Sequence, residues 1–347
     1  MKVFEVKDIA RKWVYQVGSQ EPGFLGAFFA GSINWMPEDA PWSPLSDVDI
    51  FMLVDREIAD WSEQKKFLHK GVVLEAVIFP VGRFRSPGQV LSRIDAINLS
   101  IPSIISDPSG HLTELQRTVA EGYAQRKWVR KRCEQARDNI LSEYLEMMIC
   151  SESLTEQVLN LIWAVMETAQ IPALAHLMNP TVRKCLVVSR ELLAEQGKLS
   201  LHESLLRLLG SAEMKREQVE LHLQECIRAF DRAVELIRTP FWGDFDVSNQ
   251  MRPIAIDGGW ELIRSGYPSE AIFWVLLIHN LAQTVIQNDA PDEERAQFMR
   301  RYKRILRDLG LSSRGDFRRR AELGKGILRD VMEVAEEIIA SSPAIEH

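Results

Sequence analysis

Three short polar groups interrupt the apolar segments in the first third of the chain: Gly31-Ser32, Asp47-Val48-Asp49 and Glu75. The first group ends an apolar run over 24–30, the second opens a run over 50–54, and the third stands inside a run over 72–79. A Gly-Ser turn lets the backbone approach a phosphate closely, and its N–H groups and hydroxyl can hold phosphate oxygens. Carboxylates supply the oxygen ligands that a divalent ion such as Mg²⁺ prefers. The combination predicts nucleotidyl transfer.

Asp47 and Asp49 are predicted to share one face of a strand, because successive strand side chains point to opposite faces. Val48 and Ile50 then point into the core. Two adjacent carboxylates repel each other, so one takes a proton or a cation lies between them. A carboxylate inside an apolar run is costly unless it is paired or bound to metal. We therefore expect Glu75 to join the aspartates from a neighbouring strand and to ligate metal or accept the proton of an attacking hydroxyl.

The elements that must position these groups follow from hydrophobic patterning. In the first third, the pattern predicts a helix over 7–18 and buried strands over 24–30, 48–54 and 72–79. Residues 57–69 are compatible with a helix, and 101–106 could form a further strand. A loop rich in proline, with Pro37, Pro41 and Pro44, separates the first two strands. Asp244-Phe245-Asp246 repeats the aspartate spacing without a Gly-Ser pair or a strand, so we expect it in a loop.

Segments with a period of 3.6 residues dominate after about residue 112. They cover 112–120, 127–148, 153–169, 181–196, 201–209, 212–237, 269–287, 293–309 and 314–340. The 347 residues exceed what one compact core usually holds. The predicted fold is an α+β domain with a small mixed sheet and flanking helices over 1–112, followed by an all-α domain over 113–347. The first domain is assigned to catalysis, and the second to binding the acceptor and covering the cleft.

The ordered motifs carry a resemblance to a known family. The Gly-Ser turn, a variable loop, Ser46-Asp47-Val48-Asp49 and the strand Leu74-Glu75-Ala76-Val77-Ile78 resemble the nucleotidyltransferase superfamily with the polymerase-beta-like minimal fold. The two-domain layout resembles the aminoglycoside and lincosamide nucleotidyltransferases. By motif, the resemblance covers about the first third of the chain. Beyond that it covers only the helical character of the second domain.

The resemblance implies a role for each residue of the motif. Gly31 and Ser32 would hold the nucleotide phosphates, Asp47 and Asp49 would bind two Mg²⁺ ions, and Glu75 would ligate metal or act as the base. The implied reaction transfers a nucleoside monophosphate, AMP from ATP, to a hydroxyl of a small-molecule acceptor and releases pyrophosphate. An aminoglycoside-like acceptor is the family-based expectation, and activity in a homodimer stays open.

The second domain offers two further candidates. Arg183 and Lys184 open a predicted helix, and such cations can reach a triphosphate. Lys184 is therefore a candidate nucleotide-binding residue, and the alternative is a solvated helix start. His279 follows the apolar run 271–278, where a hydrogen-bonded core histidine is expected and a role in the acceptor pocket is the alternative.

Composition limits the partners and the compartment. The formal net charge of −7 disfavours nucleic acid as a partner. The four cysteines form no Cys-x-x-Cys pair and no zinc-ligand spacing with the seven histidines, so free thiols in the cytoplasm are expected. The first seven residues lack the apolar centre of a signal peptide. The longest clean apolar run is far shorter than the roughly 20 residues that span a bilayer, so no membrane partner is expected.

Two alternatives to small-molecule transfer remain. The first is nucleotidylation of a protein or RNA acceptor, of which the acidic charge disfavours RNA. The second is a regulator that binds a nucleotide without turnover. The complete carboxylate set disfavours the regulator, because binding alone needs no general base.

Overall fold

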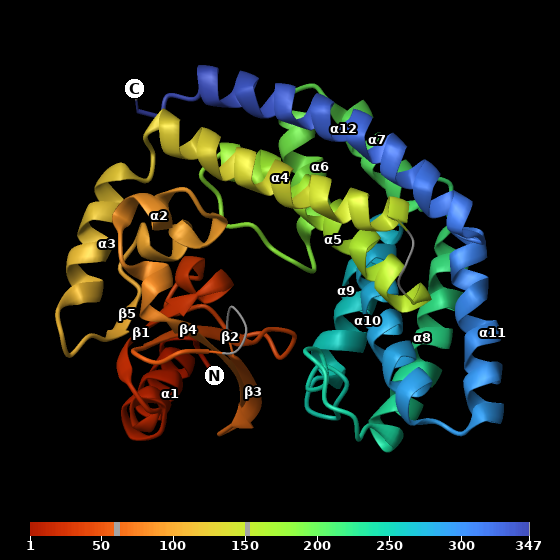
Figure 1. Ribbon diagram of the computed structural model, residues 1–347, viewed down its shortest axis with the longest axis horizontal. Coiled ribbons are helices and arrows are strands. Elements are labelled where there is room, and N and C mark those ends of the chain that lie inside the picture. Colours follow the sequence, from red (N-terminus) through yellow and green to blue (C-terminus); the bar gives the residue numbers. More distant parts are fainter. Residues whose placement is uncertain (59–62, 150–152, 347) are drawn as a thin grey trace. The chain divides into compact units, whose positions relative to one another are not determined.

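The computed structural model describes residues 1–58, 63–149 and 153–346. The chain forms two compact units. The first comprises Met1–Gln135, Leu174–Pro180 and Ile339–His347, and the second comprises Ala136–Ala173 and Thr181–Ile338. The first contains a mixed sheet and the second is mostly helical, as predicted for the fold class (Figure 1). The functional division into catalytic residues 1–112 and acceptor-binding residues 113–347 stays a prediction.

A five-stranded sheet in the order β3-β4-β2-β1-β5 forms the centre of the first unit. Its strands are β1 (Phe24–Ala30), β2 (Val48–Val54), β3 (Glu63–His69), β4 (Val72–Pro80) and β5 (Ile104–Ser106). The pair of β2 and β4 is parallel, whereas β1–β2, β1–β5 and β3–β4 are antiparallel. The three predicted buried strands are confirmed, and β5 occupies only the end of the predicted segment 101–106.

One predicted element is wrong. The segment 57–69 was expected to be compatible with a helix, but Glu63–His69 is strand β3, and residues 59–62 lie outside the described part. A two-residue turn, Lys70-Gly71, connects β3 to β4 with φ values of 49° and 79°. Positive φ at both positions is the geometry of a tight hairpin turn whose twist matches the strands. Pairing with β4 therefore determines that β3 is a strand, although the local sequence pattern of this segment is compatible with a helix.

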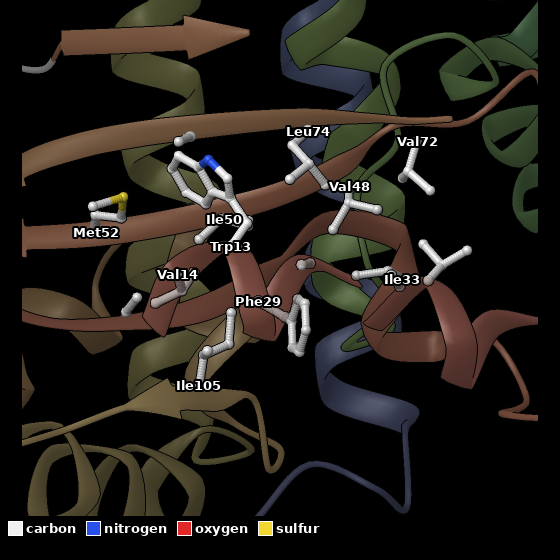
Figure 2. Close-up of a cluster of buried hydrophobic side chains, with 14 of the residues drawn as sticks. Trp13, Val14, Phe29, Ile33, Val48, Ile50, Met52, Val72, Leu74 and Ile105 are labelled. Atoms are coloured by element: carbon white, nitrogen blue, oxygen red, sulfur yellow. The ribbon is translucent and has the colours of Figure 1, made fainter. Parts of the chain in front are cut away.

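The two faces of the sheet pack against different helices. Helix α1 (Val3–Gln16) covers one face, where Val48 and Ile50 of β2 lie near Trp13 and Phe29 (Figure 2). This arrangement confirms that Val48 and Ile50 point into the core. The other face packs against α2 (Pro87–Leu91) and α3 (His111–Gly122) through a second cluster that includes Leu53 of β2 and Phe79 of β4. Because side chains alternate along a strand, the odd-numbered residues of β2 and β4 lie on this second face.

Short elements connect the strands of the first unit. They are the 3₁₀ helices η1 (Gly18–Gln20), η2 (Gly31–Trp35), η3 (Val81–Phe84) and η4 (Ile94–Leu99). The proline-rich loop between β1 and β2 contains no strand or helix after Trp35, as predicted.

The remainder of the chain is mostly helical. Its helices are α4 (Arg126–Ile149), α5 (Leu154–Ala175), α6 (Cys185–Glu195), α7 (Leu199–Leu209), α8 (Arg216–Leu236), the π-helical turn η5 (Pro253–Asp257), α9 (Gly258–Arg264), α10 (Pro268–Asp289), α11 (Asp292–Asp308) and α12 (Arg314–Ser341). Asp244-Phe245-Asp246 lies in a turn region, which confirms its assignment to a loop. Helices α5 and α10 are long and apolar enough to cross a membrane, but 72% and 83% of their apolar windows are buried inside the protein. Such burial is usual for the core helices of soluble proteins.

Two expectations for the helical part are tested by its buried side chains. Cys133, Cys185 and Cys226 are buried and form no disulfide among the described residues, and Cys150 lies outside those residues. His279 is buried on α10, but neither ring nitrogen has a hydrogen-bond partner among the described residues. The expectation of a hydrogen-bonded histidine is therefore wrong. The neighbouring Tyr302 packs edge-on against the His279 ring and donates its hydroxyl to Asn280 instead.

Candidate active site

The three predicted carboxylates converge on one face of the sheet, near the start of β2. Asp49 and Glu75 are direct partners in the parallel pair of β2 and β4, and Asp47 precedes the first residue of β2. One carboxylate oxygen from each of the three residues lies within 4.8 Å of the others. In-register parallel pairing produces this arrangement, because partner residues of adjacent strands project from the same face. The predicted convergence of the carboxylates is therefore confirmed.

Gly31 brings the end of β1 against this carboxylate group. Ala30, the last residue of β1, pairs with Asp49, and Gly31 turns the chain away with a φ of 65°. A Cβ at position 31 would overlap the Oδ2 atom of Asp49. Glycine is therefore required both for the left-handed backbone conformation and for the close approach of the Asp49 carboxylate.

Asn98 holds the turn at Gly31 through a hydrogen bond to the backbone. The backbone N–H of Gly31 donates to Asn98 Oδ1 at 3.0 Å, and Asn98 Nδ2 donates to the carbonyl of Asp95 at 3.2 Å. The Gly31 N–H is thus engaged by the protein, so the donors left for a phosphate come from the residues that follow it. Ser32, the next residue in η2, is exposed.

Sequence reasoning missed Asn98 and Lys66. Asn98 is 5% exposed within the apolar run 96–99, so the argument applied to Glu75 would have flagged it. Lys66 lies on β3 directly opposite Glu75. Its Nζ lies 2.9 Å from Asp47 Oδ2 and 2.7 Å from Glu75 Oε2. No signal in the sequence marked Lys66, because its segment was interpreted as helix-compatible.

The electrostatics of the carboxylate group favour a cation. Burial raises the pKa of Asp49 well above its ordinary value, the neighbouring charges of Asp47 and Glu75 raise it further, and Lys66 opposes the shift. Asp49 therefore holds a proton more strongly than an ordinary aspartate unless positive charge offsets its surroundings. A hard divalent ion would supply that charge, and three close carboxylates form an oxygen donor set that suits it. The residues present thus fit a divalent metal site.

Lys184, the candidate nucleotide-binding cation, belongs to the second unit. It precedes α6, and its Nζ lies 3.1 Å from Glu261 Oε1. Arg183 also pairs with Glu261, at 3.0 Å. Both cations therefore have an acidic partner within their own unit, and a role for Lys184 at a nucleotide stays a prediction.

Comparisons with known proteins include a distant structural similarity. No protein-family model matches the chain, and no curated protein matches its sequence. Among solved structures, the chain is similar to a nucleotidyltransferase-like protein from Exiguobacterium sibiricum 255-15, at 12% sequence identity and a TM-score of 0.30. The match covers 87% of this chain and 92% of that chain. A TM-score of 0.30 is too low to establish a common fold, so the function must be argued from the site itself.

Proposed function

We propose that this protein is a Mg²⁺-dependent nucleotidyltransferase that moves AMP from ATP to a hydroxyl of a small-molecule acceptor. The observation that carries the proposal is the convergence of Asp47, Asp49 and Glu75, with carboxylate oxygens within 4.8 Å, beside the Gly31 turn. In the reaction the acceptor oxygen forms a bond to the α-phosphorus while the bond from that phosphorus to the bridging oxygen breaks. Pyrophosphate leaves with the bonding electron pair, and the hydroxyl proton passes to a carboxylate.

Asp47 and Asp49 would hold the metal in this proposal. A bound divalent ion neutralises triphosphate charge and aligns the attacking and leaving oxygens. The turn at Gly31 lies against the Asp49 carboxylate, so phosphate oxygens held by Ser32 would lie next to the metal ligands. Positioning and charge stabilisation would then supply most of the rate enhancement.

Glu75 has two possible roles, and its contacts favour one of them. Its Oε1 accepts a hydrogen bond from Gln64 Nε2, and its Oε2 pairs with Lys66. Both oxygens are therefore engaged by the protein, which supports a role in holding positive charge at the site. A role as the base would require Glu75 to release one of these partners before it accepts the proton.

The acceptor follows from charge and from the family resemblance. With a net charge of −7, the protein attracts cationic molecules and repels polynucleotides. A cationic small molecule with hydroxyl groups, such as an aminoglycoside, would be attracted by the negative charge and would supply the attacking hydroxyl. Lys184 and the helical residues would contribute to nucleotide and acceptor binding.

The proposal is tested with ATP labelled at the α-phosphate, Mg²⁺ and a panel of hydroxyl-bearing small molecules. Wild type should label one class of acceptor and release pyrophosphate, and Asp49→Asn should do neither while retaining its fold. Asp244→Asn, in the loop that repeats the aspartate spacing, is the matched control and should keep full activity. Labelling of a macromolecule in whole lysate instead would identify a protein or RNA acceptor. Full transfer by Asp49→Asn would contradict the proposal.

A further inference from the structure

We propose that the Lys66 ammonium takes the place of one divalent cation at the carboxylate group, so that the protein binds a single metal ion between Asp47 and Asp49. This inference rests on the proposed function and replaces the two Mg²⁺ ions that the family resemblance implies with a single ion. It assigns Lys66 as a permanent cation of the site. Three observations support it: the contacts of Lys66, its burial, and the donor atoms that it leaves for a metal.

The contacts of Lys66 are those expected of a bridging cation. Its Nζ lies 2.9 Å from Asp47 Oδ2 and 2.7 Å from Glu75 Oε2, and so connects a carboxylate at the start of β2 with one in β4. The antiparallel register of β3 and β4 places Lys66 opposite Glu75 and on the same face. Gln64, two residues earlier on that face, donates to the other oxygen of Glu75. Strand β3 thus supplies two partners to Glu75.

Burial separates Lys66 from an ordinary edge-strand lysine. Only 9% of its side chain is exposed, whereas the adjacent Lys65, on the opposite face, is 46% exposed and pairs with Glu21. Charged lysines are common on edge strands because they prevent pairing with other chains, and that role requires exposure. A buried ammonium is stable only where carboxylates compensate its lost hydration. Lys66 therefore belongs to the carboxylate group and does not serve as a solvated edge charge.

The remaining donor atoms define a place for one ion. Both Glu75 oxygens and Asp47 Oδ2 are engaged by β3 side chains. Within the described residues, no hydrogen bond or ion pair ends on the Asp49 carboxylate, so Asp49 and the second oxygen of Asp47 remain for a metal. Three ionised carboxylates carry three negative charges, of which Lys66 offsets one. Without bound nucleotide, a single divalent ion offsets the other two charges, and a second ion would leave the group positively charged.

The experiment is a titration of the metal-free, full-length protein with Mn²⁺. The EPR signal of free Mn²⁺ is recorded at each addition to count the bound ions. Wild type should bind one ion per chain. Lys66→Met should bind a second ion, with the first bound about tenfold more tightly, because a neighbouring positive charge has been removed. Lys66→Arg should keep one ion because it keeps the charge. Lys65→Met is the matched control on the other face and should behave as wild type.

The number of Mn²⁺ ions bound by each variant tests both this inference and the proposed function. Two ions bound by wild type would overturn the inference whether or not Lys66→Met folds, and so would a Lys66→Met titration identical to that of wild type. In both cases the proposed nucleotidyl transfer would stand. An absence of Mn²⁺ binding in wild type and in both Lys66 variants would overturn the metal-dependent function itself and this inference with it.

Discussion

The carboxylate of Asp49 lies against the Cα of Gly31, in the space that a Cβ at position 31 would occupy. This relationship connects the end of β1 to the start of β2, because Ala30 and Asp49 are partners in the antiparallel pair. It explains why a glycine precedes Ser32 in the motif. The carboxylate of Asp49, a proposed metal ligand, needs the volume that any other residue at position 31 would take.

Gly31→Ala should therefore impair the site more than it impairs the fold. The left-handed φ alone costs about 1–2 kcal/mol for a residue with a Cβ, and the displaced Asp49 should weaken Mn²⁺ binding about tenfold or more. Gly71→Ala is the matched control, because Gly71 has a φ of 79° and open space around it. Urea unfolding should show a loss of stability in both variants, and only Gly31→Ala should lose Mn²⁺ affinity. Equal Mn²⁺ affinity in the two variants would contradict this account of the turn.

Asp49→Asn should stabilise the metal-free protein and remove its response to metal. Asp49 is partly buried beside two carboxylates and its pKa is raised, so its ionised form destabilises the fold at neutral pH. This destabilisation begins above pH 3.8, the ordinary pKa of an aspartate, and is complete once the pH exceeds the raised pKa of Asp49. Mn²⁺ at 100 times its Kd should stabilise wild type by about 2.7 kcal/mol in urea unfolding and leave Asp49→Asn unchanged. Stabilisation of the variant by the same amount would show that the ion binds elsewhere.

Metal affinity should fall as the pH is lowered. The metal binds the ionised Asp49 carboxylate, and the raised pKa of Asp49 means that a proton competes at a higher pH than for an ordinary aspartate. Below that pKa, Mn²⁺ affinity should decrease about tenfold per pH unit. Calorimetry in two buffers with different ionisation enthalpies should detect proton release on Mn²⁺ binding. A pH-independent affinity from pH 4 to pH 7 would be inconsistent with the raised pKa.

His279 should make the helical unit sensitive to acid. Burial lowers its pKa from 6.5 to about 3, and the charge of His222 adds to the shift. Folded His279 stays neutral while the unfolded chain takes up a proton, so the free energy of unfolding should fall as the pH decreases from 6.5 towards 3. The slope from this residue is about 1.4 kcal/mol per pH unit.

His279→Leu removes the titrating group at the same buried position, and urea unfolding at several pH values should show a shallower loss of stability. An unchanged slope in His279→Leu would mean that other groups determine the acid sensitivity.

The sequence predicts the parts of the fold that local pattern determines. Strands β1, β2 and β4 are apolar runs bounded by polar residues, and the long helices follow a regular period. Strand β3 was not predicted, because Phe67 and Leu68 are its only apolar residues and face opposite sides of the sheet. Its conformation depends on pairing with β4, a contact that no local pattern encodes.

The same distinction applies to the site. Asp47, Asp49 and Glu75 were predicted because alternation along a strand fixes which residues share a face. Lys66 was missed together with its strand, since its contacts with Asp47 and Glu75 exist only when β3 pairs with β4. For His279, an apolar helical run predicts burial but does not specify the partners of the two ring nitrogens. No motif in the sequence identifies residues of an acceptor pocket, so the acceptor-binding role of residues 113–347 stays a prediction.

The most direct test is a crystal structure of the full chain grown with Mn²⁺ and a non-hydrolysable ATP analogue. The account predicts an anomalous Mn²⁺ peak coordinated by Asp47, Asp49 and the triphosphate, with phosphate oxygens against Ser32 and the Gly31 turn. A nucleotide bound away from this turn, or a carboxylate group without Mn²⁺ at saturating concentration, would contradict the proposed function.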